Sequence, residues 1–148
     1  MKRWPFISLI SFAAITLLIA CGSTSTASPP STAAPTVPAG YTEVQITLSD
    51  FKIASSLTSF TKGVPYFFVI TNKGNTTHQF MIVPPMMGGH ITTKYMDTMS
   101  FAVIENIHTG QTRTLEITFP KSAYPELEFA CHYADHYAKG MHLPVHLV

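Results

Sequence analysis

The sequence predicts an all-β domain, an antiparallel β-sandwich of seven to eight short strands with one short helix. Apolar residues alternate with polar ones over short segments, as they do in strands that bury one face. Turn-forming residues separate these segments at regular intervals, and seven or eight such strands fit within about a hundred residues, which is typical of a sandwich. The sequence contains no internal repeat.

The first 20 residues are predicted to be a signal peptide. Lys2 and Arg3 precede an apolar segment at 7–20, ISLISFAAITLLIA, which is too short to span a bilayer comfortably but suits a signal-peptide core. The segment 18–22, LIACG, resembles the lipobox of bacterial lipoproteins, in which the cysteine is lipidated and becomes the new N-terminus. We therefore expect lipidation at Cys21 and an extracytoplasmic protein that is anchored to the cell membrane, in the periplasm or on the outer surface. A plain secretory signal is the alternative.

Residues 21–40 are predicted to form a lipid-anchored linker, and residues 41–148 form the folded domain. From residue 22 to 40 the sequence is rich in Ser, Thr, Pro and Ala, carries no charge and contains nothing larger than Val37, so it cannot bury enough surface to fold.

Within the domain, each expected strand is bounded by turn residues. The strands are predicted at 44–48, 51–53, 66–71, 78–83, 115–119, 127–131 and 143–147. The run at 66–71, YFFVIT, is continuously apolar, which is typical of a central strand. One segment differs, because Ile91, Tyr95 and Met99 recur every four residues and predict a short helix.

Composition excludes several classes of protein. Nine Lys and Arg against eight Asp and Glu leave no basic footprint for nucleic acid. Two cysteines, Cys21 and Cys131, are too few for a zinc ribbon or a disulfide-rich scaffold. If Cys21 is lipidated, Cys131 is the single free thiol of the mature protein.

Strand parity brings three metal-capable side chains to the same interior. Side chains two residues apart share a face, so His78 lies with Phe80 and Cys131 lies with Phe129. If the last strand extends back to residue 141, Met141 also points inward. By the same rule four polar residues face outward: Gln79, His132, His142 and His146. His136 lies in the loop between Cys131 and Met141, free to fold back over the site.

Two imidazoles, one thiolate and one weak thioether are the ligands of a mononuclear blue-copper centre. The segment 131–141, CHYADHYAKGM, resembles the Cys-x4-His-x4-Met copper loop of the cupredoxins, in the spacing of the rusticyanin and sulfocyanin type. The resemblance extends to segments 48–53 and 72–80 and covers most of residues 43–148. It implies a cupredoxin-type Greek-key β-sandwich that binds one type 1 copper through His78, Cys131, His136 and Met141.

Two features of the loop depart from that pattern. Ala134 and Asp135 stand where many relatives carry Pro-Gly, and the Asp135 carboxylate is close enough to hydrogen-bond the loop or stabilise Cu(II). His132 is a rival ligand in sequence, but adjacent strand residues point to opposite faces, so we favour His136.

A methionine cluster leaves an alternative open. Met81, Met86, Met87, Met96 and Met99 occur in one segment together with His90. Soft Met and His side chains suit Cu(I), so a copper chaperone or storage lipoprotein is the alternative function. Adaptable packing or docking is the simpler interpretation of these methionines.

The sequence therefore predicts a monomeric, lipid-anchored blue-copper protein that is not an enzyme. We expect it to carry single electrons between redox proteins such as cytochromes or a terminal oxidase, through transient encounters. The imidazole edge of His136 is the expected exit path, framed by Tyr133, Tyr137 and Ala138. A cysteine nucleophile with a histidine base is disfavoured, because no Gly-rich oxyanion loop or orienting acid accompanies the pair.

Overall fold

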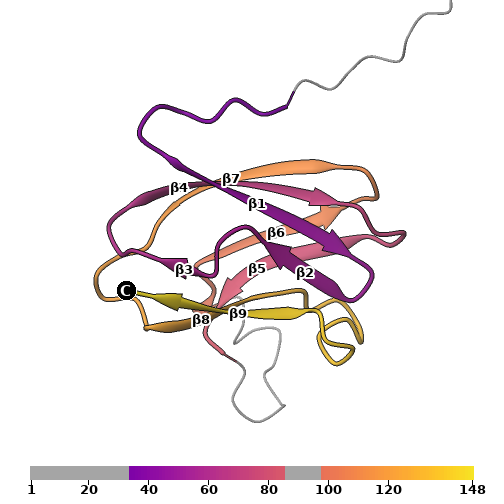
Figure 1. Cartoon of the computed structure of the whole chain (residues 1–148). Helices are drawn as coiled ribbons and strands as arrows, with labels where there is room; N and C mark the ends of the chain where they lie inside the picture. The colour runs from indigo at the N-terminus through magenta and orange to yellow at the C-terminus, as the bar shows by residue number, and fades with distance from the viewer. Residues whose placement is uncertain (1–33, 86–97) are drawn as a thin grey trace, which may run out of the picture. The chain divides into compact units, whose positions relative to one another are not determined.

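Nine strands in two sheets make up the computed structural model of the chain, which describes residues 34–85 and 98–148 (Figure 1). Their bounds are β1 Thr42–Ser49, β2 Lys52–Ser55, β3 Ser59–Phe60, β4 Pro65–Asn72, β5 His78–Val83, β6 Ala102–Ile107, β7 Thr112–Thr118, β8 Glu126–Ala130 and β9 His142–Leu147. The predicted all-β sandwich is confirmed. Within the described ranges no helix has the length and hydropathy needed to cross a membrane.

The first sheet has four strands in the order β2-β1-β4-β7. Strand β4 is its most buried member, as its continuous apolar sequence predicts. Strands β1 and β4 pair in parallel, with Val44 opposite Phe68, whereas the other two pairings are antiparallel.

The second sheet has five strands in the order β3-β9-β8-β5-β6. It is antiparallel except where the two-residue strand β3 runs parallel to the end of β9. The expectation of a purely antiparallel sandwich was therefore wrong at two pairings. Alternation in one strand reports which face is buried, but it carries no information about the direction of the neighbouring strand.

Two strands and one helix also differ from expectation. The edge strand β6 and the short β3 were not predicted; β6 alternates only weakly between partly buried and exposed positions. Most of the short helix expected at 91–99 lies outside the described residues, which exclude 86–97. Only its last two residues, Thr98 and Met99, are described, and their backbone is helical. Residues 1–33, which include the predicted signal peptide, Cys21 and part of the predicted linker, also lie outside them.

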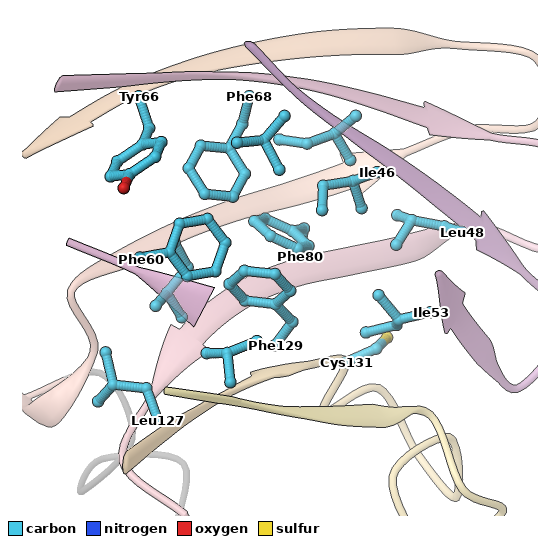
Figure 2. Packing of buried hydrophobic residues seen from close by; sticks show 14 of the residues in the cluster. Ile46, Leu48, Ile53, Phe60, Tyr66, Phe68, Phe80, Leu127, Phe129 and Cys131 are labelled. Carbon is cyan, nitrogen blue, oxygen red and sulfur yellow. The ribbon is translucent and has the colours of Figure 1, made fainter. Parts of the chain in front are cut away.

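The core fills the space between the two sheets (Figure 2). Its centre is aromatic: Phe60, Phe68, Phe80 and Phe129 contact one another with ring centroids 5.2 to 6.2 Å apart. Such rings supply most of the buried apolar area of a small sandwich. Cys131 lies near Ile53 at one end of this core (Figure 2), so a single thiol continues the apolar packing.

The topology brings three chain segments to that end of the second sheet. Strand β5 begins there at His78, and the antiparallel β8 ends there at Ala130, one residue before Cys131. Strand β9 begins there at His142, opposite Ala130 and one residue after Met141. Antiparallel pairing thus gathers residues that are up to 64 positions apart in the sequence, from His78 to His142.

Candidate metal centre

Three side chains converge at this end of the sandwich. The donor atoms of His78, Cys131 and His136 all lie within 4.8 Å of one another. Nδ1 of His78 is 3.2 Å from Nδ1 of His136, and the latter atom is 3.4 Å from Sγ of Cys131. Both imidazoles therefore direct the same ring nitrogen toward the thiol. Two imidazoles and a thiol form the donor set that suits copper among the first-row metals.

Burial governs the protonation of this cluster. His78 and Cys131 are fully buried, whereas His136 is only partly buried. Burial lowers the pKa of His78, as does the neighbouring His136, while Asp50 opposes the shift. Burial also raises the pKa of the Cys131 thiol, although the backbone N–H of Gln79 donates to Sγ at 3.3 Å and favours the thiolate. Such a thiol gives up its proton when a cation occupies the cluster.

Met141 belongs to the same buried core as Cys131 and is fully shielded from solvent. Its backbone closes the loop between them: Cys131 N–H donates to the Met141 carbonyl at 3.1 Å, and Met141 N–H donates to the His136 carbonyl at 3.0 Å. These bonds fix both ends of the loop and its central histidine. These backbone hydrogen bonds thus connect Cys131, His136 and Met141 within one closed loop.

Two residues with positive φ shape the loop. Asp135 adopts φ 67° and Gly140 adopts φ 99°. Asp is among the residues that tolerate this left-handed conformation best, which explains how Ala134-Asp135 replaces the expected Pro-Gly. The exposed Asp135 accepts a hydrogen bond from Lys139 N–H through its backbone carbonyl, at 3.0 Å.

His132 lies apart from the cluster, on the other face of the sheet as parity predicts, but it does not face solvent as expected. Its ring packs against Tyr137, with ring centroids 5.2 Å apart, and neither of its ring nitrogens has a hydrogen-bond partner among the described residues. Gln79, also expected outside, is buried, and its Oε1 accepts a hydrogen bond from His132 N–H. The expectation was wrong at both residues, because the loop folds Tyr137 over the outer face of β5 and β8. His142 and His146 are exposed, as predicted.

Tyr137 fastens that loop to the sheet. Its hydroxyl donates to the carboxyl oxygens of Glu128 at 2.9 and 3.0 Å, and Glu128 is buried on β8. Burial, followed by the hydrogen bond and the charge of Glu128, raises the pKa of Tyr137. The ring also stacks on His142 at 4.5 Å. The tyrosine that was expected to frame a docking patch is thus largely committed to holding the loop.

Three residues near the cluster were not predicted to act there. Phe51, with φ 61°, places its ring edge-on to His136 at 5.3 Å, and Nζ of Lys139 lies 4.6 Å from the Phe51 ring centroid. Asp50 and Gly74 lie beside His78. The local sequence around Asp50, Phe51 and Gly74 predicts only that the chain turns there. It does not indicate which histidine will lie beside each turn.

Several solved structures match the architecture of this chain. Auracyanin and rusticyanin are cupredoxins, and a multi-copper oxidase contains a region that matches this chain. Reduced auracyanin from the photosynthetic bacterium Roseiflexus castenholzii is 19% identical, with a TM-score of 0.56 over 74% of this chain and 99% of that chain. Rusticyanin from Thiobacillus ferrooxidans is 12% identical, with a TM-score of 0.59 over 75% and 79%. A multi-copper oxidase from Pediococcus acidilactici is 15% identical, with a TM-score of 0.51 over 78% and 28%. No protein-family model and no curated protein matches the sequence.

The architecture and the cluster together define the class: the chain has the cupredoxin fold, with a His, Cys, His cluster at one end of the sandwich. Within this class it is similar in structure to auracyanin and rusticyanin, and it covers most of the length of both.

Proposed function

We propose that this protein is a type 1 (blue) copper protein that carries single electrons between extracytoplasmic redox partners. The observation that carries the proposal is the convergence of His78, Cys131 and His136 within 4.8 Å on a cupredoxin fold. Bound copper would supply one-electron chemistry there. His78, Cys131 and His136 would be its strong ligands, and Met141 its weak axial ligand.

The rigidity of the ligand frame supports electron transfer. His78 is on β5, Cys131 directly follows β8 and Met141 directly precedes β9, so three of the four side chains are fixed by one sheet. His136 is fixed by loop hydrogen bonds and by Phe51. A frame that cannot relax keeps the same ligand geometry in both oxidation states, which favours fast exchange.

We propose that electrons enter and leave through His136. It is the least buried member of the cluster, and the aromatic rings beside it are those of Phe51 and Tyr133 rather than Tyr137. Encounters of redox proteins are weak and bury little surface, so a small contact around this imidazole is sufficient. We propose no oxidase activity, since the likeness to the oxidase concerns 28% of that chain.

Copper binding and ligand identity are tested on the chain from residue 21 onward, made soluble by Cys21→Ser. We expect one Cu(II) per chain and an intense blue or green thiolate-to-copper absorption. Cys131→Ser should abolish the colour, and His132→Ala should keep it. Colour lost in His132→Ala but kept in His136→Ala would reverse the ligand assignment.

Anchoring through Cys21 forms a separate part of the proposal. The protein made from the full sequence should fractionate with membranes, and Cys21→Ser should release it into the periplasm or medium. Equal partitioning of the two proteins would refute lipidation and leave the copper site unaffected.

The competing function is copper delivery or storage by the methionines at positions 86, 87, 96 and 99. Met86, Met87 and Met96 lie outside the described residues. If the protein is an electron carrier, changing all four to Leu should leave Cu(I) stoichiometry at one per chain and self-exchange fast. A second Cu(I) that disappears with the methionines, together with slow self-exchange, would favour the chaperone.

A further inference from the structure

The buried ring of His78 has a second nitrogen that faces oxygen atoms. While Nδ1 points toward His136 and Cys131, Nε2 lies 3.6 Å from Oδ1 of Asp50 and 3.5 Å from Oγ1 of Thr76. The His78 side chain is completely inaccessible to solvent, so these protein oxygens take the place of water beside Nε2. A carboxylate at this position favours a proton on Nε2, which leaves Nδ1 unprotonated and able to bind a metal.

The turn after β4 holds the Asp50 carboxylate in place. Asn75 donates to it twice, from its backbone N–H to Oδ1 and from its side chain to Oδ2, both at 2.9 Å. Thr76 donates to Oδ1 from its backbone N–H and its hydroxyl, both at 3.3 Å. The hydrogen bonds from Asn75, followed by those from Thr76, hold the pKa of Asp50 below its usual value. The four hydrogen bonds from Asn75 and Thr76 therefore fix the carboxylate group beside the imidazole.

Gly74 allows the carboxylate and the imidazole to approach. A Cβ at this position would lie 2.6 Å from Oδ1 of Asp50 and 2.8 Å from Nε2 of His78. Its φ is not in the left-handed region, unlike that of Gly40, Gly63, Gly110 and Gly140. Space for the Asp50–His78 contact, rather than backbone conformation, thus requires glycine here.

We propose that Asp50 is a positioning residue that acts on the metal through His78. It keeps the proton on Nε2, so that Nδ1 faces the metal, and its charge favours the more positive oxidation state, Cu(II). Gly74 provides the space for this contact. The inference rests on the proposed copper function, but its effect on the His78 tautomer is a property of the metal-free chain.

The test compares four proteins, each beginning at residue 21 and carrying Cys21→Ser: the parent, Asp50→Asn, Gly74→Ala and Glu126→Gln. Asp50→Asn keeps the size of the side chain and removes its charge. Glu126→Gln removes an equal charge from an exposed residue at the end of β8 away from Cys131, where its partner is the exposed His146. It is the matched control for net charge.

In metal-free protein at neutral pH, ¹⁵N NMR of the imidazoles should show a single Nε2–H tautomer of His78 in the parent and in Glu126→Gln. Asp50→Asn and Gly74→Ala should both show a mixture. In Gly74→Ala the Asp50 side chain keeps its charge but is displaced from His78. A mixture of His78 tautomers in this variant therefore shows that the contact itself, and not only the charge, selects the tautomer. Urea unfolding verifies that each variant is folded.

With metal, Asp50→Asn should weaken Cu(II) binding about 10- to 100-fold, as expected for loss of a partner to a ligating histidine. Cu(I) binding should change less, and each tenfold change in the affinity ratio raises the reduction potential by about 59 mV. An unchanged tautomer in Asp50→Asn, or equal shifts of the reduction potential in Asp50→Asn and Glu126→Gln, would overturn the inference. A parent protein that binds no copper would instead refute the proposed function, while the tautomer result would still decide the role of Asp50 in the metal-free chain.

Discussion

Removing the hydroxyl of Tyr137 should loosen the metal-binding loop while leaving its packing intact. Tyr137→Phe keeps the ring against Met81, Val83 and Ala130 and deletes only the donor to the buried carboxyl group of Glu128. A hydrogen bond to a charged group contributes about 1.5–3 kcal/mol. The Nδ1 atom of His142, 3.7 Å from Oε2, retains part of the interaction. We therefore expect a loss of about 2 kcal/mol.

Urea unfolding of the metal-free chain measures this loss. An unchanged m-value indicates that unfolding exposes the same surface area in the variant as in the parent protein. Tyr124→Phe is the matched control, because Tyr124 is 57% exposed, and its change should stay within about 0.5 kcal/mol. If Tyr137→Phe costs less than about 0.5 kcal/mol, the hydroxyl does not fasten the loop, and the argument that the loop is preorganised by Glu128 fails.

Two further changes test the turn and the axial position. Asn72→Ala should destabilise the protein by about 2–3 kcal/mol in the same unfolding assay. The fully buried Asn72 side chain donates to the carbonyls of Thr76 and Ile107 and accepts from Gly74 N–H, and the variant loses all three hydrogen bonds. A loss of stability as small as that of Tyr124→Phe would contradict this. Met141→Leu should keep copper and colour but raise the reduction potential measured by redox titration, because losing a donor disfavours Cu(II) more than Cu(I); a lower potential, or loss of copper, would contradict a weak axial role.

Much of the fold follows from local patterns in the sequence. Alternation identified the strands that bury one face, and the uninterrupted apolar run at 66–71 identified the most buried strand of its sheet. Parity placed Cys131 and His78 inside the sandwich and His132 on the opposite face of its strand. The edge strand β6 was missed because it is only partly buried, and its alternation is correspondingly weak.

The predicted outward residues show where local patterns stop. Parity gave the correct face for Gln79 and His132, but Tyr137 from the loop packs on that face, so Gln79 is buried and His132 is only partly exposed. The solvent exposure of a sheet face depends on what packs against it. Here the residue that packs against it, Tyr137, belongs to a loop, and the alternation of apolar residues in strands does not predict the position of a loop residue.

The sequence by itself determined the strands, the inward direction of His78 and Cys131, and the spacing of the loop that carries His136 and Met141, because a strand has a fixed period of two and the loop ligands are close in the chain. Only the tertiary structure decided that β1 and β4 run parallel, that Glu128 anchors the loop, and that Asp50 meets His78 across a turn with room only for glycine. These contacts join residues from different turns and strands, and chain packing, rather than any local period, sets the distance between them.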